Sequence, residues 1–442
     1  MGNAPSSDAV HAASPLPRGH FALVFAALLV TAAGNTALQS VLPVIGRAIE
    51  IPDMGIAFVF SLSALIWTFS APFWAHQSDR RGRRLLVQVG LAGFGLSMLL
   101  CATVILAGLK GLIAPLLTFV LFTLARALFG VFGAAANPAA QAFIASRTTP
   151  AERTNALAML SSAFGLGTII GPAVAPFFIL PFVGLSGPMF AFALIAVVVV
   201  VAVRVGLPDD DPTHAGGRGA AASIGAVGGA PTGAHVLAAE AASETGARRR
   251  LSVTDPRVKA FMIYGFAVGS LQAATGQALG FLIIDRIGGG AGIDSAKLIG
   301  LAFMAGAGAT LLAQWGIIRT LSLNPSQLMR WGALIAAIGT AGIALAPDFH
   351  ALAIAFAVQS AGFGLARPGF TAGSSLAVDR PDQGAVAGAV TSVNGACFVL
   401  APAIGIGLYE LVPALPYWLA AAGCAAAALF AWTHPKLRTS RA

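Results

Sequence analysis

The chain of 442 residues is 57% hydrophobic and only 10% charged, with a mean hydropathy of +0.83. This composition excludes a soluble globular protein and leaves room for many membrane spans. The net charge of +9 raises nucleic acid as a partner, so the distribution of the basic residues along the chain has to be considered.

Apolar runs of about 20 residues, the length of a helix that crosses a bilayer, recur along the whole chain. They predict an all-α membrane protein with twelve spanning helices, six on each side of a central gap. The predicted spans are 19–45, 54–76, 84–107, 113–145, 151–179, 184–206, 258–286, 296–320, 327–346, 350–378, 382–410 and 414–433. A secretory signal is the alternative for residues 18–37, but the apolar pattern continues through Pro43 without a cleavage site.

The segments outside the spans predict the domain organisation. Residues 1–18, rich in Ala, Ser and Pro, are expected to be a disordered tail. Residues 207–257 combine Gly, Ala and charge without apolar periodicity, which predicts a flexible cytoplasmic linker. This linker separates two predicted six-helix bundles, 19–206 and 258–434, and a short tail follows at 435–442.

Basic residues gather on one side of the predicted membrane. If the N-terminus is cytoplasmic, 20 of the 26 Lys and Arg lie on the inner side, four in outer loops and two within spans. The positive-inside rule then places both termini and the linker in the cytoplasm, as in a bacterial inner membrane. The basic surplus matches anionic lipid of the inner leaflet, which argues against nucleic acid as a partner.

The two halves of the chain share a pattern. A glycine-rich run leads to Pro138 in "GVFGAAANPAAQAF" and to Pro368 in "AGFGLARPGFTAGS". A later small residue and proline follow in both, as Gly171-Pro172 and Ala401-Pro402. Duplicated six-helix halves are a transporter architecture, with the substrate site near the midplane where the halves meet.

Three stretches of the sequence resemble motifs of one transporter family. The stretch "AHQSDRRGRR" at 75–84 resembles the loop between helices two and three of the major facilitator superfamily, except that Ala75 stands for its first glycine. "LARALFGVFGAAANP", with Arg126, is similar to the fourth-helix motif of that superfamily. "GLGTIIGPAVAP" resembles part of the fifth-helix motif of the twelve-helix drug:proton antiporters, tetracycline exporters included.

The resemblance assigns a role to the charged stretch at 75–84. Asp79 is expected just past the end of the second helix, where a carboxylate accepts hydrogen bonds from a neighbouring helix N-terminus. Gly82 permits a tight turn there. In the family this loop latches the cytoplasmic gate, which implies a gating role for Asp79, Arg80, Gly82 and Arg83. The alternative is a basic loop that serves topology alone.

A second gating element is expected on the fifth predicted span. Gly165, Gly167 and Gly171 form a smooth helix face for packing or sliding against another helix. Pro172 then interrupts the helical hydrogen bonding. Ordinary packing of small residues and a hinge role remain equal alternatives for Gly167, Gly171 and Pro172.

Two arginines are the ionisable side chains placed deep within predicted spans. Arg126 falls halfway along the fourth span and Arg367 in the inner half of the tenth. Charges at such depth are functional candidates, and a buried guanidinium favours an anionic partner. For Arg126 a hydrogen-bonding anchor is the alternative, whereas Arg367 is favoured as a substrate contact.

Uncharged polar residues complete the predicted substrate cavity. In this superfamily helices one, four, seven and ten line the cavity, and most of these residues fall on them. The predicted residues are Asn35, Gln39, Asn137, Gln272, Gln277, Gln359 and Asn394. Hydrogen bonding between helices is the alternative for each of them.

These features predict a secondary transporter that works by alternating access and exports a small organic anion or zwitterion. An uptake carrier for an anionic metabolite or chelate is the alternative, and a membrane-embedded enzyme or receptor is a remote one. No metal site, disulfide framework or cofactor is predicted, and a monomer in the lipid bilayer is expected.

A proton or a counter-anion remains open as the coupling ion. Because no Asp, Glu or His lies deep in a predicted span, proton coupling would require a rim group such as Asp285, Glu410 or His76, or titration of the substrate itself.

Overall fold

The computed structural model describes residues 18–145, 147–148, 150–209, 253–287, 292–379 and 382–438. The described chain is almost entirely helical, as a bilayer requires, because a helix satisfies its own backbone N–H and C=O groups. The helices of the first half are α1 (Arg18–Ala48), α2 (Asp53–Arg81), α3 (Arg83–Leu109), α4 (Pro115–Phe132), η1 (Gly133–Ala135), α5 (Ala136–Ala145), α6 (Pro150–Val174), η2 (Ala175–Phe178) and α7 (Gly187–Gly206). Those of the second half are α9 (Lys259–Ile287), α10 (Ile293–Leu311), η4 (Leu312–Ile317), α11 (Ile318–Leu321), α12 (Pro325–Leu345), α13 (Phe349–Leu376), α14 (Gln383–Leu411), α15 (Leu415–Thr433) and α16 (Pro435–Arg438).

Eleven of the twelve predicted spans correspond to helices long enough to cross a membrane. Within the described ranges, eleven helices are long and apolar enough to cross a membrane. The remaining predicted span, 151–179, corresponds to α6 and η2, whose apolar part is the shorter stretch Gly165–Phe178. The all-α membrane fold predicted from the apolar runs is therefore confirmed. The predicted linker falls mostly on residues 210–252, outside the described residues.

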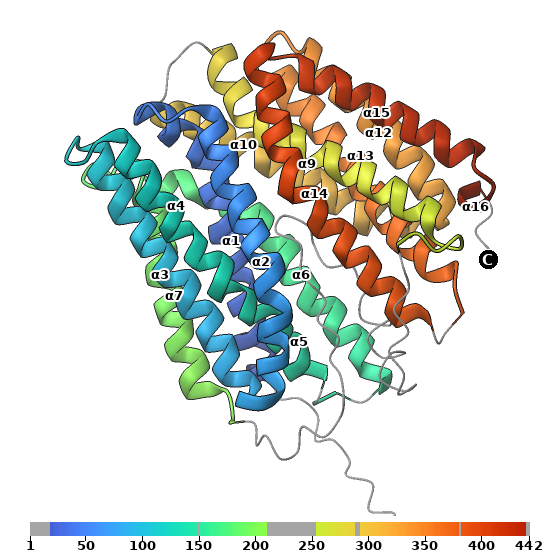
Figure 1. Ribbon diagram of the computed structural model, residues 1–442, viewed down its shortest axis with the longest axis horizontal. Coiled ribbons are helices and arrows are strands. Elements are labelled where there is room, and N and C mark those ends of the chain that lie inside the picture. Colours follow the sequence, from blue (N-terminus) through green and yellow to red (C-terminus); the bar gives the residue numbers. More distant parts are fainter. Residues whose placement is uncertain are drawn as a thin grey trace, which may run out of the picture.

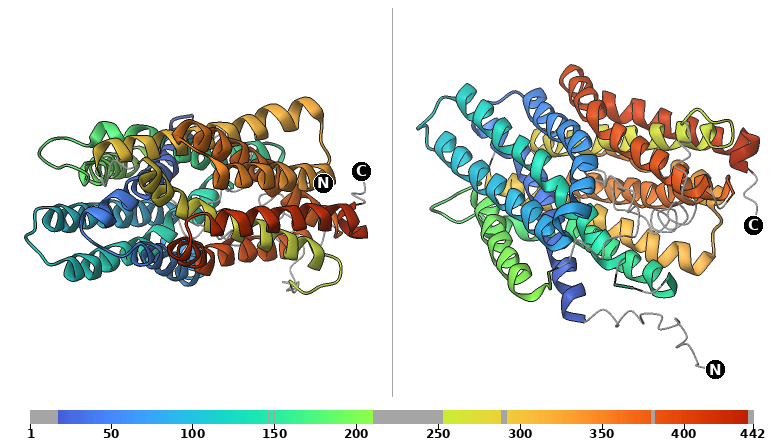
Figure 2. Two further views of the ribbon diagram at one scale, coloured as in Figure 1. Left: turned by 90° about the horizontal axis from the view of Figure 1, so that it is seen from above. Right: turned by 60° about the horizontal axis from the view of Figure 1, so that its bottom comes forward.

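The helices form two groups that follow the order of the chain. Helices α1 to α7 pack together, and so do α9 to α15. Figure 1 shows these blue-to-green and yellow-to-red groups meeting at one end and diverging toward the other, and Figure 2 shows the same division from two further sides. We call them the first group and the second group. The end where α1 stops is the Arg47 end, and the end where α2 meets α3 is the Gly82 end.

Contacts between the two groups join α2 with α14, α6 with α10, and α1 with both α9 and α10. Two glycines allow close approach at the Arg47 end. A Cβ atom on Gly280 would lie 2.5 Å from Pro43 Cγ, and one on Gly300 would lie 2.8 Å from the carbonyl oxygen of Pro172. Side chains at these two positions would force the groups apart at this end.

Prolines interrupt two of the helices predicted as continuous. The predicted span 113–145 is divided into α4 and α5 by the 3₁₀ turn η1, because Pro138 lacks the N–H that would bond the carbonyl of Ala134. The span 151–179 ends in the 3₁₀ turn η2, where Pro176 removes a donor in the same way. The predicted span 113–145 still corresponds to one membrane-crossing stretch, Pro115–Ile144.

Polar side chains fix the starts of helices in the second group. Asn324 and Gln327 form a capping box at the start of α12. Arg257 bonds both Asp255 and Asp382, and its Nη1 lies 2.7 Å from Asp382 Oδ2, so the start of α9 is tied to the start of α14. These hydrogen bonds from Arg257 hold the pKa of the Asp255 carboxyl below its ordinary value.

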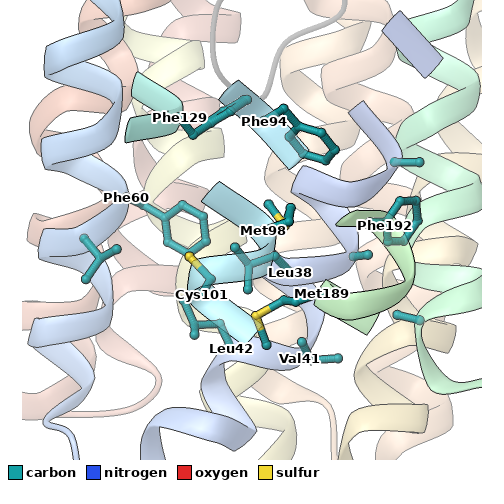
Figure 3. Packing of buried hydrophobic residues seen from close by; sticks show 14 of the residues in the cluster. Leu38, Val41, Leu42, Phe60, Phe94, Met98, Cys101, Phe129, Met189 and Phe192 are labelled. Atoms are coloured by element: carbon teal, nitrogen blue, oxygen red, sulfur yellow. The ribbon is translucent and has the colours of Figure 1, made fainter. Parts of the chain in front are cut away.

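An apolar core fills the first group. Figure 3 shows Leu38 of α1, Phe60 of α2, Phe94 of α3 and Phe129 of α4 packed with the side chains of α7. Because lipid supplies no hydrophobic force between helices, tight packing of this kind holds the spans together.

Candidate functional site

A cavity of about 220 Å³ lies between the two groups of helices. Both groups contribute to its wall, since lining residues come from α1, α2 and α6 on one side and from α9, α10, η4, α13 and α14 on the other. The polar lining residues are Asn35, Thr36, Gln39, Thr168, Gln272, Gln277, Thr310, Gln314, Gln359, Ser360 and Arg367. The aromatic ones are Phe60, Phe303, Phe356, Phe363 and Phe398.

Arg367 is the one charged side chain among the described residues that line this cavity. It lies on α13, directly before Pro368, and is partly buried. Its Nη1 donates to Gln272 Oε1 at 3.4 Å and its Nη2 to Asn394 Oδ1 at 3.2 Å. Both acceptors are neutral amides, so they orient the guanidinium without neutralising its charge. The arrangement suits recognition of an anionic group.

Two glutamines join the groups across the cavity. The Nε2 of Gln39 on α1 donates to the Oε1 of Gln277 on α9, and the two residues are 238 positions apart. Arg47 and Asp285, which also bond across the groups, have the same separation of 238. The equal separations show that α1 and α9 pack in parallel where the two groups meet.

Gln359 is held rigidly in the wall of the cavity by the second group. Its Nε2 donates to the hydroxyls of Thr275 and Thr340, at 3.1 and 2.8 Å. Gly339 of α12 allows this packing, since a Cβ there would lie 2.2 Å from the backbone nitrogen of Gln359. The side chain is a fixed polar contact of the cavity.

Three predicted cavity residues do not line the cavity. Arg126 is fully buried in α4, and its Nη2 donates to the Oδ1 of Asn35, which does line the cavity. Asn137 of α5 accepts from Gln141 Nε2 at 2.9 Å. Asn394 of α14 lies behind Arg367 and orients it.

Five polar lining residues were missed by the sequence analysis: Thr36, Thr168, Thr310, Gln314 and Ser360. Helical spacing could have identified part of this set, because Thr36 lies three residues before Gln39 on the same face of α1. Gln314 lies in the π-helical segment η4, within the predicted eighth span. The sequence analysis considered mostly helices one, four, seven and ten as lining the cavity and therefore did not include it.

Charged residues close the molecule at the Arg47 end. The Nη2 of Arg47 lies 2.8 Å from Asp53 of α2, and the same guanidinium pairs with Asp285 of α9. The Tyr409 hydroxyl donates to Asp285 as well. Glu410 accepts from the backbone N–H of Met54 at 3.0 Å, which also links α14 to α2. The sequence analysis had identified Asp285 and Glu410 only as rim acids.

The Gly82 end contains the predicted gating loop. Gly82 has φ +89°, a conformation that favours glycine, and it forms the sharp connection between α2 and α3. Helix α2 continues to Arg81, so Asp79 and Arg80 lie in its last turn; placing Asp79 beyond the helix was wrong. The side chains of Asp79 and Arg80 lie outside the described residues. Arg83 begins α3.

The predicted glycine face of α6 packs closely on α1. A Cβ on Gly167 would lie 2.6 Å from Ala32 Cβ, and one on Gly171 would lie 2.1 Å from the carbonyl oxygen of Ala33. The Thr36 hydroxyl bonds the carbonyl of Gly167 at 3.2 Å. Pro172 lies inside α6, at the contact with Gly300 of α10.

A helical membrane protein with a polar cavity between two groups of spans has the architecture of a secondary transporter. The family model described as Major Facilitator Superfamily matches residues 24–324, and the chain belongs to this family. Membership makes the chain an integral membrane transporter and not an enzyme.

Curated relatives cover only part of the chain. It is 30% identical to Multidrug resistance protein 2 of Bacillus subtilis (strain 168) over 181 residues, which are 41% of this chain and 42% of that protein. It is 33% identical to the Puromycin resistance protein pur8 of Streptomyces alboniger over 160 residues, 36% of this chain and 29% of that protein. These matches span less than half of either relative.

Solved structures share the fold over nearly the whole chain. The crystal structure of the human organic anion transporter MFSD10 (TETRAN) superposes with a TM-score of 0.63 at 19% identity, covering 95% of this chain and 100% of that one. A bacterial homolog of the human lysosomal transporter Spinster, in an inward-facing and unoccupied conformation, gives a TM-score of 0.63 at 15% identity, covering 94% and 95%.

Proposed function

We propose that this transporter exports a small organic molecule carrying an anionic group, an organic anion or a zwitterion, and binds it at Arg367. The observation that carries the proposal is the charge of the cavity: Arg367 has neutral hydrogen-bond partners and no carboxylate beside it among the described lining residues. A guanidinium in such a site favours a planar anionic group through paired, charge-assisted hydrogen bonds.

The cavity also limits the size and character of the substrate. Its volume of about 220 Å³ is below the range of roughly 300–1,000 Å³ typical of ligand pockets. Phenylalanine rings from both groups line it, and glutamine and threonine side chains supply hydrogen bonds. A compact molecule with an apolar body and one anionic end fits this lining.

The names of the relatives support export. Several are called multidrug resistance proteins and one is called a puromycin resistance protein, and one structural neighbour is called an organic anion transporter. An uptake carrier for an anionic metabolite or chelate would use the same cavity, so the direction of transport has to be measured.

The proposed orientation and gating follow from the sequence. The Gly82 end, both termini and the linker face the cytoplasm of a bacterial inner membrane, because most Lys and Arg lie on that side. Asp79, Arg80, Gly82 and Arg83 form the latch of the cytoplasmic gate, while Gly167, Gly171 and Pro172 let α6 move against α1. The transporter works as a monomer.

The lining residues also bear on the coupling ion. A proton can drive transport only if a group binds it in one state and releases it in another. The described lining residues include no Asp, Glu or His. We therefore propose that the carrier exchanges anions, with a rim group or the titration of the substrate itself as the alternative routes for a proton.

Counterflow in proteoliposomes tests the substrate class. Vesicles are loaded with unlabelled compound and uptake of the labelled compound is followed for aromatic carboxylates, their neutral amides and aromatic amines. We expect counterflow for the carboxylates, little for the amides and none for the amines, with little change when a pH gradient is imposed. Preference for the amines, or strict dependence on the gradient for a carboxylate of fixed charge, would contradict the proposal.

A further inference from the structure

Arg126 of α4 is the most deeply buried charged side chain among the described residues of the first group of helices. Its side chain is 0% exposed. One of its nitrogens, Nη2, donates to the Oδ1 of Asn35. The other two, Nε and Nη1, are buried without a hydrogen-bond partner. A guanidinium has five N–H groups in a fixed fork, so most of the donor capacity of Arg126 is unused.

The surroundings of Arg126 do not supply a counter-charge. Its guanidinium carbon lies 4.4 Å from the centre of the Phe129 ring and 5.7 Å from that of Phe60, and Figure 3 shows the apolar packing around both rings. Ring faces attract a cation but accept no strong hydrogen bond from it. Among the ion pairs formed by the described residues, none includes Arg126. A buried charge without a partner is strongly unfavourable, which favours an anion beside it.

The substrate cavity gives access to Arg126. Asn35, its hydrogen-bond partner, lines the cavity, and so does Phe60, whose ring faces the guanidinium. Arg126 therefore lies directly behind the cavity wall, separated from the cavity by these two side chains. Rotation of the Asn35 amide would expose the guanidinium to a small anion in the cavity.

We propose that Arg126 is a second anion-binding subsite, behind the wall formed by Asn35 and Phe60, that takes a small monovalent anion. Chloride and the carboxylate of a transported molecule share the required chemistry, a compact acceptor for two or three N–H groups. The subsite is separate from the contact at Arg367, since Arg126 lies on α4 and Arg367 on α13. Its binding is measurable on purified protein without transport.

The first test compares melting temperatures of purified protein in sodium chloride, sodium formate and sodium gluconate at equal ionic strength. We expect chloride and formate to stabilise the wild type relative to the bulky gluconate, because an anion that binds the native state stabilises it. Arg126→Gln should reduce this difference and, combined with Arg367→Gln, should abolish it, whereas Arg126→Lys should retain a weakened one. Arg319→Gln, which changes an exposed arginine of α11, should leave the difference intact. Arg367→Gln alone removes the other anion contact and should leave the part of the difference that depends on Arg126.

Asn35→Asp provides a test that does not remove the buried charge. This nearly isosteric change places a carboxylate beside Arg126, so the protein should become more stable and lose its response to chloride.

A bromide titration gives an independent readout. The centre of the Trp67 ring lies 5.1 Å from that of Phe129, so bromide bound at Arg126 should quench the fluorescence of Trp67. The saturable part of this quenching should disappear in Trp67→Phe, and the bromide affinity should fall at least about tenfold in Arg126→Gln.

The results of these tests distinguish a substrate carboxylate from a free inorganic anion, and binding at Arg126 from binding at Arg367. Competition between chloride and a transported carboxylate would assign the subsite to the substrate, and chloride binding without competition would assign it to a free inorganic anion. Equal stability of the wild type in all three salts would overturn the proposal. A chloride response that survives when Arg126→Gln or Asn35→Asp is combined with Arg367→Gln, or that is lost completely in Arg367→Gln alone, would also overturn it and would place the anion elsewhere.

Discussion

Three arginines have three different electrostatic environments in this transporter. Arg47 pairs with two carboxylates at the Arg47 end. Arg367 faces the cavity and donates hydrogen bonds to two neutral amides. Arg126 lies behind the cavity wall and donates a hydrogen bond to one amide, that of Asn35. A paired arginine holds two elements together, whereas an arginine without a carboxylate is free to recognise an anion. The sequence indicated Arg126 and Arg367 by their depth in the spans, but the partners of all three depend on helix packing.

The ion pair between Arg47 and Asp285 should stabilise the state that is closed at the Arg47 end, and the Asp79 loop should oppose it. Arg47→Gln is expected to open the Arg47 end, because it breaks the contact between α1 and α9. Asp79→Asn is expected to shift the population the other way and to slow transport without reducing the amount of protein in the membrane.

Both shifts are measured with a cysteine introduced at Thr310, which lines the cavity. A thiol reagent that does not cross the membrane is added from either side of sealed vesicles. Labelling from the Arg47 side should increase in Arg47→Gln and be restored in part by combining Arg47→Asp with Asp285→Arg. Lys110→Gln, an exposed residue on the same side, serves as the control. Unchanged labelling in Arg47→Gln and Asp79→Asn would show that neither residue controls a gate.

At the scale of helices, the spans follow from apolar length, but their rotation about the helix axis does not. Asn35, Gln39, Gln272, Gln277 and Gln359 line the cavity as polar residues on the expected helices. Asn137 of α5, which follows the 3₁₀ turn η1, does not line the cavity and accepts a hydrogen bond from Gln141 instead. The alternative of a hydrogen bond that does not face the cavity could not be decided from sequence periodicity alone.

The contact between α1 and α6 depends on individual glycines in a way that can be tested. Gly171→Ala should destabilise the protein by about 1–3 kcal/mol, since its Cβ would lie 2.1 Å from a backbone oxygen of α1. Gly165→Ala, six residues earlier on α6, is the matched control for stability, because its Cβ would lie 3.9 Å from the nearest atom, a Leu311 side chain.

Thermal unfolding and transport rate are measured for both variants. Gly165→Ala should keep the wild-type stability, and only its stability serves as the control because Gly165 lines the cavity. Gly171→Ala should lose stability and transport together if packing alone is disturbed. Loss of transport without loss of stability would identify the glycine face as a moving contact. Equal stability of the two variants would contradict the close packing of α6 on α1.

For the whole molecule, composition and apolar length are sufficient to predict the membrane class and eleven of the twelve spans. The motifs around Asp79, Arg126 and Gly171 predict the family. The junction between the two groups could not be predicted, because Arg47, Asp285 and Tyr409 come together only when α1, α9 and α14 meet. Residues far apart in sequence show no local signal of such a contact.

The most direct test of the central proposal, an anion-binding transport cavity with Arg367 as its charged contact, is a saturation curve for the carboxylate that gives the strongest counterflow. Arg367→Gln should raise the half-saturating concentration at least about tenfold, because a charge-assisted hydrogen bond is lost. Arg367→Lys should restore binding only in part, since a point charge replaces a planar fork. Arg319→Gln should match the wild type. Equal half-saturating concentrations in all four proteins would contradict the account and would give Arg367 a role in packing.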